Sequence, residues 1–132
     1  MIKPARLFLV TAILEAATGL SLLSIPSIPL SLLLGINQTV PEALLISRLA
    51  GAALLSIGII CYFAGNDQHS PAQHGVLIGI LFYNLTATTI LAYAGISLEM
   101  RGILLWPAVV LHAALGLWCV ACLRPSKTMN CR

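Results

Sequence analysis

The fold class of this chain follows from residues 42–64, EALLISRLAGAALLSIGIICYFA, an almost uninterrupted apolar run. As an α-helix rising 1.5 Å per residue, this run spans roughly 34 Å, which is enough to cross the hydrocarbon core of a bilayer. Its only charged residues are Glu42, at its start, and Arg48. A segment of this length and composition is typical of a transmembrane helix.

Three further apolar runs, at about residues 7–24, 75–96 and 102–123, have a similar length and composition. Of the 132 residues, 59% are hydrophobic and 8% are charged, whereas soluble domains are about 45–50% apolar and about 25% charged. We therefore expect an all-α protein, a four-helix transmembrane bundle with up-down topology over residues 1–124. A polar tail at 125–132 would follow it.

Proline, glycine and polar residues separate the runs. A short apolar piece, Leu30–Leu34, is too short to cross a bilayer and is expected at the interface or against the mouth of the bundle. Thr39-Val40-Pro41-Glu42 predicts a capped helix start before the second run, with Thr39 as the cap. Ser70-Pro71-Ala72-Gln73 predicts the same before the third run.

The positive charges outside the runs predict the orientation. Most lie near the two ends of the chain, at Lys3, Arg6, Arg124, Lys127 and Arg132. The two loops on the other side hold only Arg101. The positive-inside rule then places both termini and the loop at 65–74 in the cytoplasm, with the protein in the cytoplasmic (inner) membrane. Because the positive charges form no stripe, we expect no nucleic-acid partner.

Each apolar run holds one strongly polar or charged residue well away from its ends: Glu15, Arg48, Asn84 and His112. In this orientation Glu15, Asn84 and His112 lie roughly 12–16 Å from the cytoplasmic side. Arg48 lies nearer the outer side, but its long side chain reaches toward the midplane. An unpaired charge at such a depth costs on the order of 3 kcal/mol or more, so it usually has a partner or a function.

Small residues lie about one helical turn from each of these side chains, which favours helix packing on the same faces. We therefore expect an inward-facing cluster in which Glu15 and Arg48 form an ion pair. The predicted ligand site or polar core comprises Glu15, Arg48, Tyr83, Asn84 and His112.

Two interpretations of this cluster remain open. It would bind a small ligand, proton or ion, with His112 able to exchange a proton near neutral pH. Alternatively, it would only specify helix packing, as buried ion pairs can, in an accessory or structural subunit. A proton-coupled small-molecule transporter that uses Glu15 is a further alternative, although an arginine beside Glu15 would compete with a cationic substrate.

Other patterns are weaker. Cys119 and Cys122 form a C-x-x-C pair that could act as a redox dithiol, but packing cysteines explain it as well. His69, His74 and Asp67 share a loop, and loop residues of this kind more often simply face water than bind a metal. We expect no metal, no cofactor and no catalytic residues. The expected partners are the lipid bilayer and, as a possibility, a second copy or a larger membrane complex.

The segment Ala12-Ile13-Leu14-Glu15-Ala16-Ala17-Thr18-Gly19 resembles the first helix of small multidrug resistance transporters. These are four-span proteins in which a membrane-embedded glutamate exchanges protons for cationic drugs. The resemblance implies that Glu15 is the coupling carboxylate.

A broader resemblance is to small bacterial four-helix membrane proteins of the DoxX-like kind. It is carried by an early glutamate, Arg48-Leu49-Ala50-Gly51 in the second run, Tyr83-Asn84 in the third and His112 in the fourth. It implies a four-helix bundle in the cytoplasmic membrane that in some cases is an accessory to oxidoreductases.

Overall fold

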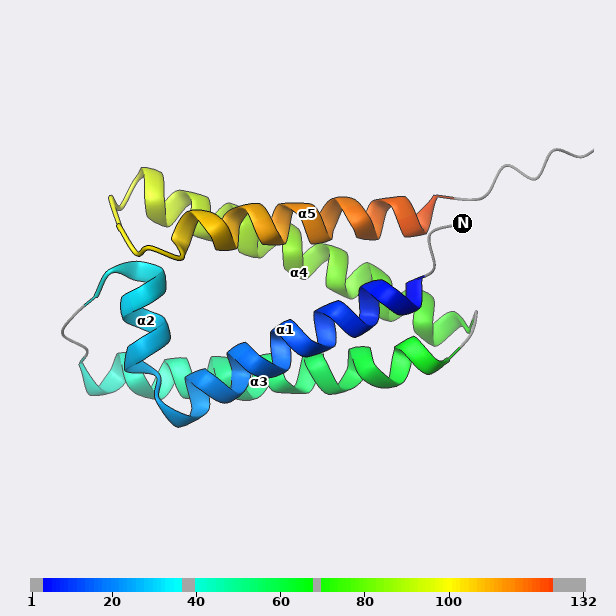
Figure 1. Ribbon diagram of the computed structural model, residues 1–132, viewed down its shortest axis with the longest axis horizontal. Coiled ribbons are helices and arrows are strands. Elements are labelled where there is room, and N and C mark those ends of the chain that lie inside the picture. Colours follow the sequence, from blue (N-terminus) through cyan, green and yellow to red (C-terminus); the bar gives the residue numbers. More distant parts are fainter. Residues whose placement is uncertain (1–3, 37–39, 68–69, 125–132) are drawn as a thin grey trace, which may run out of the picture.

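The structure is a computed structural model that describes residues 4–36, 40–67 and 70–124. Its helices are α1 (Pro4–Ser24), α2 (Ser27–Leu34), α3 (Pro41–Asn66), α4 (Pro71–Ile96) and α5 (Leu105–Leu123) (Figure 1). Four of them, all except α2, are long and apolar enough to cross a membrane. The predicted all-α fold is confirmed, with α2 as a short additional helix. The predicted polar tail at 125–132 lies outside the described residues.

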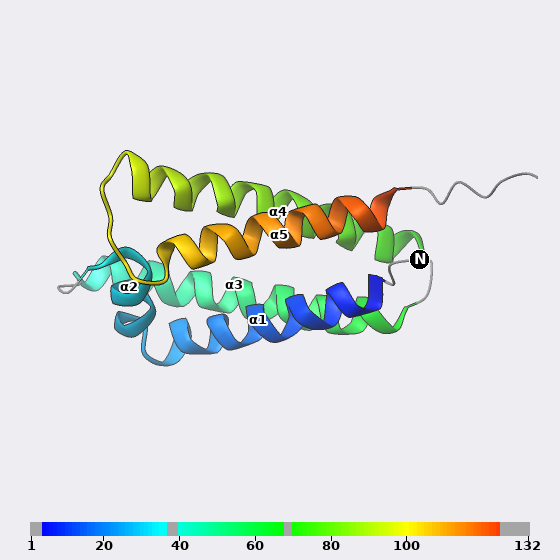
Figure 2. The ribbon, with the colours of Figure 1, turned by 45° about the horizontal axis from the view of Figure 1, so that its top comes forward.

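The long helices form two pairs, because α1 packs along α3 and α4 packs along α5 (Figures 1 and 2). The start of α1, the end of α3, the start of α4 and the end of α5 lie at one end of the bundle (Figure 1). Helix α2 and the segment that joins α4 to α5 lie at the opposite end (Figure 1). We call this second end the α2 end.

Glycines bring α1 and α3 into close contact. A Cβ atom on Gly19 would lie only 2.7 Å from the carbonyl oxygen of Gly51, and one on Gly51 would lie 2.8 Å from the carbonyl oxygen of Gly19. Gly58 meets the backbone of α1 in the same way, near Ala12 and Ala16. Because these residues carry no side chain, the two backbones approach more closely than other residues would permit.

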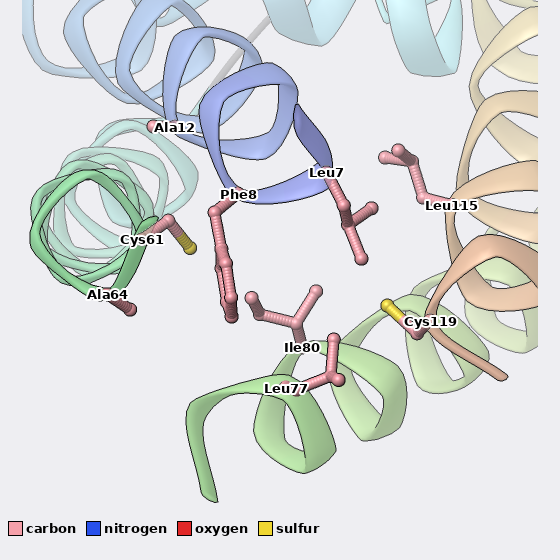
Figure 3. Close-up of a cluster of buried hydrophobic side chains, with 9 residues drawn as sticks. All are labelled: Leu7, Phe8, Ala12, Cys61, Ala64, Leu77, Ile80, Leu115 and Cys119. Atoms are coloured by element: carbon pink, nitrogen blue, oxygen red, sulfur yellow. The ribbon is translucent and has the colours of Figure 1, made fainter. Parts of the chain in front are cut away.

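An apolar core joins the two pairs at the end opposite the α2 end. Leu7 and Phe8 of α1 are completely buried there. Side chains from α1, α3, α4 and α5 surround them (Figure 3). By contrast, large apolar side chains such as Leu49 and Phe82 are each 72% exposed on the outside of the bundle. An apolar exterior of this extent is expected where lipid is the solvent.

Helix α2 is attached to the start of α5. It is capped at its end by Gly35, which adopts a left-handed conformation with φ 73° and donates its N–H to the carbonyl of Ser31. The amide of Leu104 donates to the carbonyl of Leu32 at 2.9 Å. Gly102 is buried against the backbone of Leu33, where a Cβ atom would not fit. This contact explains why α5 begins at Leu105, later than the predicted run.

Both predicted helix starts are confirmed in position, at Pro41 and Pro71, and the predicted cap is confirmed for the second of them. Ser70 caps α4, since its hydroxyl accepts the amide N–H of Gln73 at 3.0 Å. Helix α3 begins at Pro41 with Val40 at the cap position, where no side chain can accept a hydrogen bond. Thr39, the predicted cap, lies outside the described residues.

Candidate functional site

Three helices contribute four polar side chains to the interior of the bundle, and we call these four residues the polar layer: Glu15 of α1, Tyr83 and Asn84 of α4, and His112 of α5. Glu15 is 4% exposed and Asn84 is completely buried. The hydroxyl of Tyr83 donates to Oε2 of Glu15 at 3.3 Å. The rings of Tyr83 and His112 meet edge to face, with centroids 5.6 Å apart. The polar layer therefore links α1 to α4 and α4 to α5.

A hydrogen bond of 2.9 Å joins Nδ1 of His112 to Oδ1 of Asn84. The side-chain amide of Asn84 donates in turn to the backbone carbonyl of Ile80, also at 2.9 Å. Thr88 donates its hydroxyl to the backbone carbonyl of Asn84 at 2.7 Å. These bonds hold Asn84 in one orientation, with its carbonyl oxygen toward the imidazole.

The predicted ion pair between Glu15 and Arg48 is wrong. Arg48 is exposed on the surface of α3, and within the described part of the chain no salt bridge involves it or Glu15. The reason is helical periodicity, because the face of α3 that packs on α1 carries Ser47, Gly51 and Gly58. Arg48 lies about 100° around the helix from Ser47, among outward-facing apolar side chains.

A cavity of about 480 Å³ lies between α1, α2 and α5 at the α2 end of the polar layer, and we call it the α2-end cavity. His112 is one of its lining residues, together with the hydroxyl residues Thr18 and Ser21 of α1. The remaining lining residues are small or apolar: Ala17, Ile28, Pro29, Leu32, Leu33, Leu91, Leu104, Pro107, Ala108 and Leu111. The cavity is thus an apolar space with a few polar groups.

A second cavity, of about 240 Å³, lies between α3 and α4, and we call it the α3–α4 cavity. It is lined by Ile57, Ile60, Cys61, Val76, Gly79, Ile80 and Tyr83. These residues belong to the half of the bundle where α3 ends and α4 starts. Tyr83 lines the α3–α4 cavity and its ring contacts that of His112, which lines the α2-end cavity. The two cavities therefore approach the polar layer from opposite halves of the bundle.

The remaining candidates lie away from the polar layer or outside the described residues. Cys119 is buried in the apolar core and Cys122 is half-buried, and both are free thiols. Their redox role stays a prediction. Within residues 4–36, 40–67 and 70–124, no three His, Cys, Asp or Glu side chains gather as metal ligands would. His69 of the predicted loop lies outside these ranges.

The structure thus brings together four of the five residues predicted for the ligand site or polar core, and Arg48 is the exception. Sequence reasoning missed Thr18 and Ser21, which line the α2-end cavity. Their signal was the spacing Glu15-x-x-Thr18-x-x-Ser21, which places three polar residues along one side of α1. No protein-family model, curated protein or solved structure matches this chain.

Proposed function

We propose that this chain is a small integral membrane protein that binds a small, largely apolar ligand in the α2-end cavity. The observation that carries the proposal is a cavity of about 480 Å³ whose wall includes His112 of the buried polar layer. Ligand sites typically measure about 300–1,000 Å³ and combine apolar walls with a few well-placed polar groups. Polar groups within membrane segments also commonly mark functional sites.

In the proposed arrangement, the four long helices cross the cytoplasmic membrane in up-down order with both termini inside. The distribution of Lys and Arg supports this orientation. Tyr62, Tyr93 and Trp106 are 56%, 58% and 51% exposed near helix ends, where aromatic side chains favour the membrane interface. The α2-end cavity would then lie in the outer half of the bilayer. The DoxX-like resemblance agrees with such a bundle.

The test uses a variant that fills the cavity. Ala108 lines it and is half-buried, whereas Ala114 is exposed on the same helix and does not line it. Binding of 4-hexylphenol and of its methyl ether, 4-hexylanisole, is measured on protein in lipid nanodiscs. We expect wild type and Ala114→Phe to bind at least one probe and Ala108→Phe to lose it. Equal binding by Ala108→Phe, or no binding by wild type, would overturn the proposal.

A second function, proton-coupled transport, is favoured by two specific observations. Glu15 is buried with a tyrosine hydroxyl as its partner and has no cation beside it among the described residues, so the objection raised by Arg48 disappears. The polar layer is also approached by cavities from both halves of the bundle. In this function Glu15 exchanges a proton for a substrate, as the resemblance of its helix to small multidrug resistance transporters implies.

The transport proposal is tested in liposomes that carry a pH gradient, with ethidium as the cationic probe. We expect wild type and the control Arg48→Gln to take up ethidium, while Glu15→Gln reconstitutes equally well but does not. Uptake by Glu15→Gln at the wild-type rate would reject a coupling role for this carboxyl group.

A further inference from the structure

The hydrogen bonds around His112 define the chemistry that the α2-end cavity can accept. We infer that its ligand is an apolar molecule that donates a hydrogen bond, through a hydroxyl group, to Nε2 of His112. This inference rests on the proposed binding function and adds to it the class of ligand.

The argument begins at the backbone carbonyl of Ile80, which can only accept a hydrogen bond. The atom of Asn84 that faces it must therefore be the amide nitrogen, as the 2.9 Å contact has it. The other end of the same side chain, the carbonyl oxygen, then faces His112. A carbonyl oxygen can only accept, so Nδ1 of His112 carries the proton and donates it to this bond.

In a neutral imidazole with its proton on Nδ1, the other nitrogen is a hydrogen-bond acceptor. Nε2 of His112 has no hydrogen-bond partner among the residues that the structure describes. It is not sealed in the protein either, since the single fully buried side-chain nitrogen or oxygen without a partner in that part of the chain is Oγ1 of Thr11. Because His112 lines the α2-end cavity, Nε2 is the acceptor that it offers to an occupant.

A hydrogen-bond acceptor in an apolar cavity favours ligands that can donate a hydrogen bond. A hydroxyl group donates to it, whereas an ether, a ketone or a carboxylate offers only lone pairs and leaves Nε2 unpaired. The hydroxyls of Thr18 and Ser21 also line the cavity, and neither forms a hydrogen bond within the described chain. They can serve the ligand oxygen or a second polar group. The other lining residues suit an apolar body of the ligand.

The experiment compares 4-hexylphenol with 4-hexylanisole, which has the same apolar body but no donor. Binding is measured on the full chain in lipid nanodiscs, for wild type and for His112→Phe, which keeps a ring but has no acceptor. The quantity compared is the affinity for the phenol divided by the affinity for the ether. We expect this ratio to be about three- to tenfold larger in wild type than in His112→Phe. Dividing the wild-type ratio by the ratio for His112→Phe cancels the different partitioning of the two probes into lipid.

A second readout does not depend on the variant folding. In protein labelled with ¹⁵N-histidine, the Nε2 resonance of His112 should be that of an unprotonated nitrogen, and it should shift when 4-hexylphenol is added but not with the ether. The exposed His74 in the first turn of α4 serves as the internal control, and its resonances should not respond.

The outcomes separate the two proposals. If both probes bind wild type with the same ratio as His112→Phe, or if Nε2 carries the proton, the ligand class is wrong while the cavity remains a binding site. If neither probe binds wild type, the proposed function and the inference built on it both fail.

Discussion

The close contact between α1 and α3 leads to a prediction about stability whose size can be estimated from the structure. In Gly19→Ala the new Cβ atom would lie 2.7 Å from the carbonyl oxygen of Gly51 and 2.7 Å from the amide nitrogen of Leu55. Both are backbone atoms, so no flexible side chain can move away. Ordinary contact begins near 3.4 Å, and the two helices must therefore separate by about 0.7 Å.

Overpacking of this kind costs typically about 1–3 kcal/mol, and we expect Gly19→Ala to lower the free energy of unfolding by about 2 kcal/mol. The matched control is Gly75→Ala in the first turns of α4, where a Cβ atom would meet nothing within 4 Å. That change should be neutral, or should stabilise the protein by up to about 1 kcal/mol through helix propensity. Unfolding by SDS in mixed micelles, followed by far-UV circular dichroism, measures both variants.

A stability of Gly19→Ala within about 0.5 kcal/mol of Gly75→Ala would refute the packing described for α1 and α3. The double variant gives a second check. Because each of Gly19 and Gly51 would contact the other's carbonyl oxygen, one separation of the helices relieves both overlaps. Adding Gly51→Ala to Gly19→Ala should therefore destabilise less than the sum of the single changes.

Three further predictions concern the polar layer and use the same titration. Arg48→Leu should change the free energy of unfolding equally, within about 0.5 kcal/mol, in wild type and in Glu15→Gln, because Glu15 and Arg48 do not interact. A coupling above about 1 kcal/mol would show that the two residues form an ion pair after all. Tyr83→Phe should destabilise by about 0.5–1 kcal/mol, since the buried carboxyl of Glu15 loses its donor at 3.3 Å; no loss would mean that this bond contributes nothing. A double-mutant cycle with Asn84→Leu and His112→Phe should give a coupling of about 0.6 kcal/mol, the average for hydrogen bonds between transmembrane helices, and at most about 1.7 kcal/mol. Strict additivity would contradict the contact.

Composition and hydropathy were sufficient for the fold class. Four long apolar segments can only satisfy their backbone groups in lipid as helices, so their number and approximate limits follow from the order of the residues. The capping serine before α4 is equally local, because Ser70 and its partner Gln73 are three residues apart. Helix α2 is shorter than any span, and its docking against residues 102–104 depends on contacts between segments far apart in the chain.

Hydropathy along the chain also predicted part of the polar layer. Glu15, Asn84 and His112 are strongly polar residues in predominantly apolar segments, and exposing them to lipid without partners is unfavourable enough to turn them inward. Arg48 is likewise a charged residue in an apolar segment, so the same rule would turn it inward, yet it lies on the outside of α3. The two positions 47 and 48 differ by one residue, but they differ by about 100° in direction.

The order of amino acids thus determines four long apolar helices, each with a strongly polar residue away from its ends, because hydropathy and helical rise depend only on neighbours along the chain. Which of those residues meet depends on the rotation of each helix about its own axis. That rotation is set by packing between helices, as where Gly19 meets Gly51 between α1 and α3. The partners of Glu15, the tautomer of His112 and the α2-end cavity are consequences of that packing, and they become visible only when all the helices are in place.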